Sequence, residues 1–165
     1  MLVQCTVESV RVHTLTGQHV VMLQPKESDR FLPIWIGADQ AASIATQLAG
    51  VRADRPLTHD LVVDILRKLG VEITRVVVKE LVETGDGNGV FHGSIFIQSG
   101  ERELEVDSRA SDAIALALRC DARILVAESV LDRSAIRPEG EADGDDDDLA
   151  IFKQFIQTLP DEPSG

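Results

Sequence analysis

The segment SRASDAIALALR, residues 108–119, constrains the fold more than any other. Apolar residues occupy nearly every side of the helix that it predicts, which leaves almost no polar face: Ala113, Ile114, Leu116, Ala117 and Leu118. A helix that is apolar all round is typical of a protein core. We therefore expect it to be buried, with Ser111 as its N-cap and Asp112 in its first turn.

Two groups of short strands joined by turns are predicted around this helix. The first group covers residues 2–12, 19–24 and 31–37, and the second covers residues 71–82, 90–98 and 101–107. In the first strand the alternation of apolar residues changes phase near Glu8 and Ser9, which predicts a β-bulge. Pro33 indicates an edge position or a bulge for the third strand. Each group reads as an antiparallel β-meander.

Two further helices and a last strand complete the predicted elements. Small and apolar residues recur at helical spacing over 39–49, and RPLTHDLVVDILRKLG, residues 55–70, reads as a helix with Thr58 as its N-cap. Residues 124–131 read as a strand. We predict an α+β fold, with a mixed or antiparallel sheet from two β-meanders, about three packed helices and a short C-terminal helix.

Acidic residues are concentrated at the C-terminal end. The formal net charge is −12, and residues 137–165 contribute −7 of it through nine acidic and two basic residues. We expect a domain over residues 1–135, an acidic disordered linker over 136–148, and an amphipathic helix with a tail over 149–165. Nonspecific nucleic-acid binding depends on a basic surface, so any such role here needs a local basic pocket or a metal ion.

The N-terminal residues and the cysteines favour a cytoplasmic protein. The first twelve residues have neither a basic start nor a continuous apolar run, so they do not form a signal peptide. No segment has the length of a membrane span. Cys5 and Cys120 lie far apart in the sequence and lack metal-ligand spacing, so we expect reduced thiols.

Two helix starts carry the polar residues that chemistry would need. Arg55, His59 and Asp60 precede or open one helix, and the second start carries Asp107, Arg109, Ser111 and Asp112. Helix N-termini favour anions, arginine binds phosphate in bidentate fashion, and histidine can transfer protons. The same residues are also ordinary cap, dipole and ion-pair partners, so a structural interpretation stays open. Motifs such as GxGxxG, the P-loop, HExxH and GxSxG are absent.

Three stretches together resemble the bifunctional nuclease (BFN) domain family. They are FLPIWIGADQAASIA, RPLTHDLVVDILRKLG and DSRASDAIALALR, in the order and at the separations of that family. The resemblance covers roughly residues 1–135, and the chain is most similar in kind to bacterial, actinobacterial-like members of the family. It implies nuclease activity on DNA and RNA and a homo-oligomer, with a dimer favoured. One departure is Ala110, where the family pattern has proline.

Our leading hypothesis from this resemblance is a nuclease that depends on Mg²⁺ or Mn²⁺. His59, Asp60 and Asp112 would be catalytic, Asp107 and Asp112 would bind the metal, and Arg55, Arg109 and Ser111 would bind the substrate. The alternative is a non-catalytic, oligomeric binding module that recognises an anionic ligand or a protein partner. In that case the two helix starts are structural, and the helix within 149–165 recruits the partner.

Overall fold

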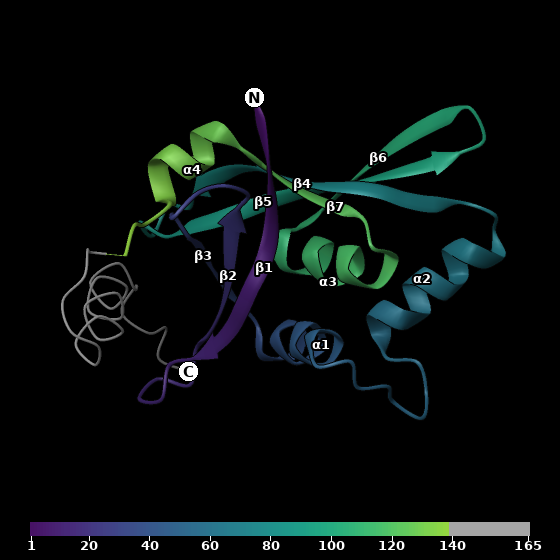
Figure 1. The fold of residues 1–165 in the computed structure, drawn as a ribbon, viewed down its shortest axis with the longest axis horizontal. Coiled ribbons are helices and arrows are strands. Elements are labelled where there is room, and N and C mark those ends of the chain that lie inside the picture. The colour runs from purple at the N-terminus through teal and green to yellow at the C-terminus, as the bar shows by residue number, and fades with distance from the viewer. Residues whose placement is uncertain (139–165) are drawn as a thin grey trace.

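The computed structural model describes residues 1–138, and its centre is a mixed sheet of seven strands (Figure 1). The strand order is β3-β2-β1-β7-β4-β5-β6. The strands are β1 (Leu2–Val12), β2 (His19–Pro25), β3 (Leu32–Ile36), β4 (Glu72–Glu83), β5 (Gly89–Ser99), β6 (Arg102–Arg109) and β7 (Arg123–Ala127). The predicted α+β class with two β-meanders is confirmed.

The last strand, β7, joins the two meanders. It pairs antiparallel with β1 and parallel with β4, which makes the sheet mixed. The register of β1 against β2 shifts between Val7 and Ser9, so the predicted bulge is confirmed. Pro33 lies in β3 at one edge of the sheet, where a missing backbone N–H is tolerated. The opposite edge is β6, whose residues are exposed over most of its length.

Four helices pack on this sheet. They are α1 (Ala38–Leu48), α2 (Thr58–Lys68), α3 (Ala110–Cys120) and α4 (Glu128–Ser134). Buried residues run along α3 from Ala110 to Ala117, as its apolar sequence predicts. Both α1 and α2 contact α3, and Figure 1 shows these three helices close together, with α2 outermost. The helix α3 therefore positions the starts of its two neighbours.

The C-terminal part of the described chain differs from the prediction. Residues 124–131 were expected to form one strand, but β7 ends at Ala127 and α4 begins at the next residue. The expectation was wrong because Val130 and Leu131 are buried at helical rather than alternating positions. Most of the predicted linker and all of residues 149–165 lie outside the described residues. None of the helices within residues 1–138 has both the length and the apolarity of a membrane span.

Candidate functional site

His59, in the first turn of α2, connects this helix to both α1 and α3. Its Nδ1 is 2.7 Å from the Ser43 hydroxyl on α1, and its Nε2 is 2.9 Å from Asp112 Oδ1 on α3. The other carboxylate oxygen of Asp112 accepts a hydrogen bond of 2.7 Å from Arg109 Nε. We call these four residues the His59 junction. The junction brings together both helix starts that the sequence singles out.

Burial and hydrogen bonding limit what His59 can do in this arrangement. Its side chain is 10% exposed, whereas that of Asp112 is 26% exposed and that of Arg109 is 62% exposed. Both imidazole nitrogens already have a protein partner. A substrate atom could contact His59 only after one of these bonds had opened. In this geometry the imidazole orients three helices relative to one another.

The charge of Asp112 is stabilised within the junction. Burial alone would raise the pKa of this carboxyl group, but the hydrogen bonds from Arg109 and His59 and the charges of both residues act in the opposite direction. Their combined effect is larger, so the pKa of Asp112 lies below its ordinary value of 3.8. Asp112 is therefore ionised at neutral pH.

A second ion pair joins α2 to the other end of α3. Asp60 Oδ1 accepts a 2.7 Å hydrogen bond from Arg119 Nε, and Asp60 Oδ2 accepts one of 3.0 Å from the Leu57 amide. The Arg119 side chain is only 5% exposed and also donates to the carbonyl oxygens of Ala115 and Ser43. The bond from the Leu57 amide lowers the pKa of Asp60 most, and Arg119 lowers it further against the effect of burial.

These contacts correct two predictions about helix caps. Leu57, and not Thr58, occupies the N-cap position of α2, because the Asp60 carboxylate reaches back to the Leu57 amide. Ser111 is also not a cap. Strand β6 runs directly into α3, so Arg109 occupies the N-cap position and Ser111 lies inside the first turn. The hydroxyl of Ser111 is thereby free of a capping role.

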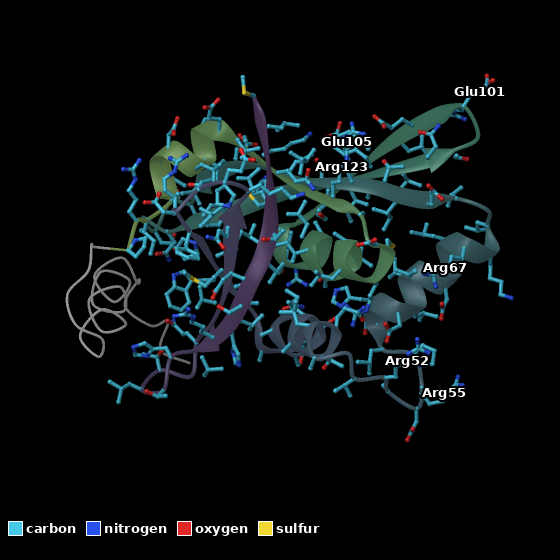
Figure 2. All side chains as sticks on the ribbon, in the orientation of Figure 1. Arg52, Arg55, Arg67, Glu101, Glu105 and Arg123 are labelled. Carbon is cyan, nitrogen blue, oxygen red and sulfur yellow. The ribbon has the colours of Figure 1, made fainter. Side chains whose placement is uncertain are left out.

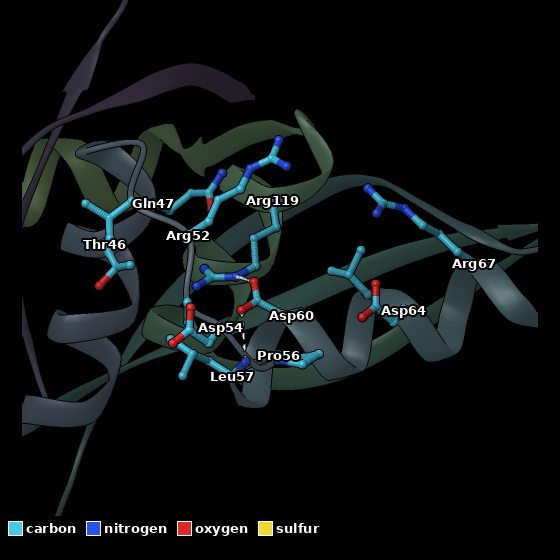
Figure 3. Close-up of a pocket in the computed structure, with 13 residues that line it drawn as sticks. Thr46, Gln47, Arg52, Asp54, Pro56, Leu57, Asp60, Asp64, Arg67 and Arg119 are labelled. Atoms are coloured by element: carbon cyan, nitrogen blue, oxygen red, sulfur yellow. Dashed lines mark hydrogen bonds and ion pairs between the residues drawn. The ribbon is translucent and has the colours of Figure 1, made fainter.

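A cleft of about 530 Å³ opens beside the Asp60–Arg119 pair (Figure 3). It lies between the C-terminal part of α1, the loop before α2, and α2 itself. Three arginines line it: Arg52, Arg67 and Arg119. Three aspartates also line it: Asp54, Asp60 and Asp64. We call it the arginine cleft. Arg52 and Arg67 are exposed, and their side chains have no hydrogen bond or ion pair within residues 1–138.

Not every predicted residue belongs to these two places. Arg55 is exposed in the loop before α2, which Figure 2 shows at the edge of the molecule, and it does not line the arginine cleft. Asp107 lies opposite Ser94 on β6, while the preceding residue, Val106, lies opposite the core residue Ile95. Because side chains alternate along a strand, Asp107 is directed away from the core side of β6. Within residues 1–138, Asp107 is not grouped with His59 and Asp112 as metal ligands would be.

Two residues of the site escaped the sequence analysis. Ser43 is a buried serine on the otherwise apolar side of α1, beside Ile44. Arg119 follows Asp112 by seven residues, which is two helical turns, and so lies on the same side of α3. Two signals in the sequence could have revealed them. For Ser43 the signal is a polar residue within an apolar stripe, and for Arg119 it is the spacing of seven residues from Asp112.

The comparison with protein families identifies the chain. A family model described as "Bifunctional nuclease domain" matches residues 21–139, well over half of the sequence. The chain belongs to the bifunctional nuclease domain family. The match includes all three stretches that carry the resemblance, and with them both helix starts.

Relatives of this bifunctional nuclease domain protein are found in bacteria and plants. "Uncharacterized protein Rv1829" of Mycobacterium tuberculosis is 35% identical over 163 residues, which cover 94% of each chain. "Bifunctional nuclease 1" of Oryza sativa subsp. japonica is 25% identical over 118 residues. That match covers 71% of this chain but only 35% of the rice protein. "Bifunctional nuclease" of Oryza minuta matches to the same extent.

The carboxylates of the bifunctional nuclease domain do not fit the predicted metal site in the observed arrangement. Both oxygens of Asp112 accept hydrogen bonds, as do both oxygens of Asp60, and in each pair one donor is an arginine. Within residues 1–138 no three histidine, cysteine or acidic side chains are grouped as metal ligands would be. A need for Mg²⁺ or Mn²⁺ stays a prediction.

Proposed function

We propose that this protein is a nuclease that hydrolyses phosphodiester bonds in DNA and RNA, with the arginine cleft as its substrate site. The observation that carries the proposal is the position of Asp60, a predicted catalytic residue, in the wall of a cleft that also has three arginines. A polyanion needs cationic donors to contact its phosphates, and Arg52 and Arg67 supply two guanidinium groups in the cleft, beside the carboxylates of Asp54 and Asp64. The relationship to rice proteins named bifunctional nucleases supports the same activity.

The residues have separate roles in this proposal. Arg52 and Arg67 bind backbone phosphates, and Arg119 fixes Asp60 through its hydrogen bond. Arg55, in the exposed loop before α2, would contact the substrate outside the cleft. Asp60, whose side chain is 35% exposed, orients the attacking water. His59 and Asp112 act as positioning residues, because they fix the start of α2 against α1 and α3. Arg109 and Ser111 bind phosphate at the second helix start.

A second function is favoured by the saturated hydrogen bonds of the His59 junction. A catalytic base needs a free lone pair, and neither nitrogen of His59 is without a protein partner. A binding module that recognises an anionic ligand without hydrolysing it would retain the same junction and the same arginines. A homo-oligomer, with a dimer favoured, a protein partner for residues 149–165 and a cytoplasmic location remain predictions under either function.

A nuclease assay with purified full-length protein tests the proposal. Single-stranded DNA, duplex DNA and RNA are incubated with Mg²⁺, with Mn²⁺ or with EDTA. The variants are Asp60→Asn and the double variant Arg52→Gln/Arg67→Gln. The matched control is Arg123→Gln, because Arg123 is equally exposed but lies on β7, away from the cleft in Figure 2. Each variant is compared at equal concentration of folded protein.

The expected result is a tenfold or larger loss of kcat/KM in the double variant and normal activity in Arg123→Gln. Phosphate contacts depend on salt, so the double variant should also show a smaller salt dependence. Equal activity in all proteins would identify a contaminant and contradict the proposed site. Nucleic-acid binding without hydrolysis, lost in the double variant, would support the binding module instead. Loss of activity with EDTA would support the predicted metal requirement.

A further inference from the structure

A smaller groove of about 170 Å³ lies at the opposite ends of α1 and α3 from the arginine cleft. Gly37, just before α1, and Ala110, the first residue of α3, both line it. Arg109 and Ser111 line it as well, beside apolar residues of β3 and β5 such as Ile34 and Val90. We call it the helix-start groove. Two helix N-termini therefore meet at one depression of the surface.

Both helices begin there without a side-chain cap. The N-cap positions are Gly37 for α1 and Arg109 for α3, and at neither does a side chain accept a hydrogen bond from the helix. The first amides of an α-helix have no acceptor within the helix, and they carry the positive end of its dipole. The two helix starts thus present unpaired N–H donors at the groove, where a ligand with negatively charged oxygens would satisfy them.

The side chain of Ser111 gives a second reason to expect a ligand in the groove, separate from the uncapped helix amides. The residue is 7% exposed and its side chain lines the groove. Its hydroxyl makes no hydrogen bond to any part of the chain that the structure describes. Its oxygen is not among the fully enclosed, unpaired side-chain atoms within residues 1–138, so the hydroxyl is a free donor that solvent can reach. An acceptor that enters the groove would pair with it.

Arg109 supplies a positive charge at the mouth of the groove. Its Nε is bound to Asp112, but its side chain is 62% exposed and its two terminal nitrogens make no hydrogen bond within residues 1–138. Asp112 offsets part of this charge, because its carboxylate stays ionised while it accepts hydrogen bonds from Arg109 and His59. Asp39 in the first turn of α1 is exposed and carries the opposing charge. Each helix start thus carries one aspartate, and the α3 side differs by the two terminal nitrogens of Arg109, which can donate to an anion.

We propose that the helix-start groove binds the phosphate group of a nucleotide or nucleic acid. The amides of Ala110 and Ser111, the Ser111 hydroxyl and the terminal nitrogens of Arg109 would donate to the phosphate oxygens. The choice of a nucleotide rests on the proposed nuclease function, but the phosphate contact itself does not. The groove would then hold one phosphate at one end of α3, while the arginine cleft binds others at its far end.

NMR titration of the full-length protein with inorganic phosphate tests the inference. Backbone amide resonances report which residues respond, and adenosine monophosphate and unphosphorylated adenosine are titrated in parallel. We expect saturable shifts of the Ala110 and Ser111 amides with phosphate and with the monophosphate, but not with adenosine. Ser111→Ala should weaken binding about tenfold, the order of magnitude of one hydrogen bond to a charged group.

A charged substitution makes the test independent of Ser111. Val90 lines the groove and is 45% exposed, so Val90→Glu adds a negative charge there with little cost in folding. Leu104→Glu adds the same charge on β6 at a similarly exposed position, 41%, which does not line the groove. Val90→Glu should weaken phosphate binding at least tenfold, and Leu104→Glu should leave it unchanged.

The outcomes separate this inference from the proposed nuclease function. Three results would overturn the groove as a phosphate site. They are the absence of saturable shifts, shifts centred on Arg52 and Arg67, and a phosphate affinity in Val90→Glu equal to that of the unchanged protein. Phosphate binding that Val90→Glu weakens, in a protein without nuclease activity, would support the groove while the nuclease proposal fails. Nuclease activity without phosphate-induced shifts at Ala110 and Ser111 would support the nuclease proposal and overturn the groove as a phosphate site.

Discussion

Replacing His59 with alanine measures how much the His59 junction contributes to stability. The change removes a hydrogen bond to an ionised carboxylate, which contributes roughly 1.5–3 kcal/mol, and one to a hydroxyl, which contributes roughly 0.5–1.5 kcal/mol. Asp112 keeps its bond from Arg109 and is 26% exposed, so water recovers part of the loss. Ser43 is buried and leaves an unpaired hydroxyl. We expect a loss of about 3 kcal/mol.

Urea-induced unfolding, followed by circular dichroism at pH 7, gives this free energy directly. The corresponding fall in Tm should be about 6–12 °C for a domain of this size. The matched control is His92→Ala, because His92 is half-buried on β5 and its side chain has no hydrogen bond within the described chain. It should lose less than about 1 kcal/mol. A loss below 1 kcal/mol for His59→Ala, at an unchanged m-value, would refute the argument that the junction holds the three helices together.

Three further predictions follow from other contacts. The pKa values of Asp60 and Asp112 are lowered in the folded protein, so the stability that these carboxylates contribute is complete above the ordinary value of 3.8 and is lost as the pH falls through the lowered values. The free energy of unfolding, measured between pH 7 and 3, should therefore decrease below about pH 5. The decrease should be less steep in Asp112→Asn. Asp60→Asn leaves the buried Arg119 without its counter-charge and should cost about 2 kcal/mol in urea unfolding, whereas Asp64→Asn, exposed on the same helix, should cost less than 0.5 kcal/mol. Gly93→Ala places a Cβ 3.2 Å from the Ala110 Cα at the buried start of α3, so a loss of about 1 kcal/mol in the same assay is expected, and a gain would show that α3 can shift.

Much of the fold was predictable because its signals are local. The bulge between Val7 and Ser9 follows from a change of phase in the apolar pattern, and the buried α3 follows from its lack of a polar face. The edge position of Pro33 follows from its missing amide. The prediction of the boundary between β7 and α4 was wrong because the two residues at the boundary, Ala127 and Glu128, are not typical turn residues that would mark it.

The site was predictable only in part, because its contacts join residues far apart in the sequence. His59 and Asp112 are 53 positions apart, and Arg119 and Asp60 are 59 apart. The sequence placed polar residues at two helix starts, but the partner of each depends on how α2 crosses α1 and α3. Asp107 shows the limit most clearly. The hypothesis from the family resemblance made it a metal ligand together with Asp112, yet within residues 1–138 it is not grouped with Asp112 and His59 as metal ligands would be.

The difference between a structural and a chemical role lies in which atoms remain free to bond. His59 and Asp112 were predicted from the sequence as catalytic residues, but their polar atoms, like those of Arg119, are largely committed to neighbours inside the protein. Uncommitted donors lie at both ends of the α1–α3 pair. Arg52 and Arg67 lie at one end, and Ser111 lies with the uncapped amides at the other. Substrate contacts should therefore occur at these two ends, and the His59 junction between them should fix their separation.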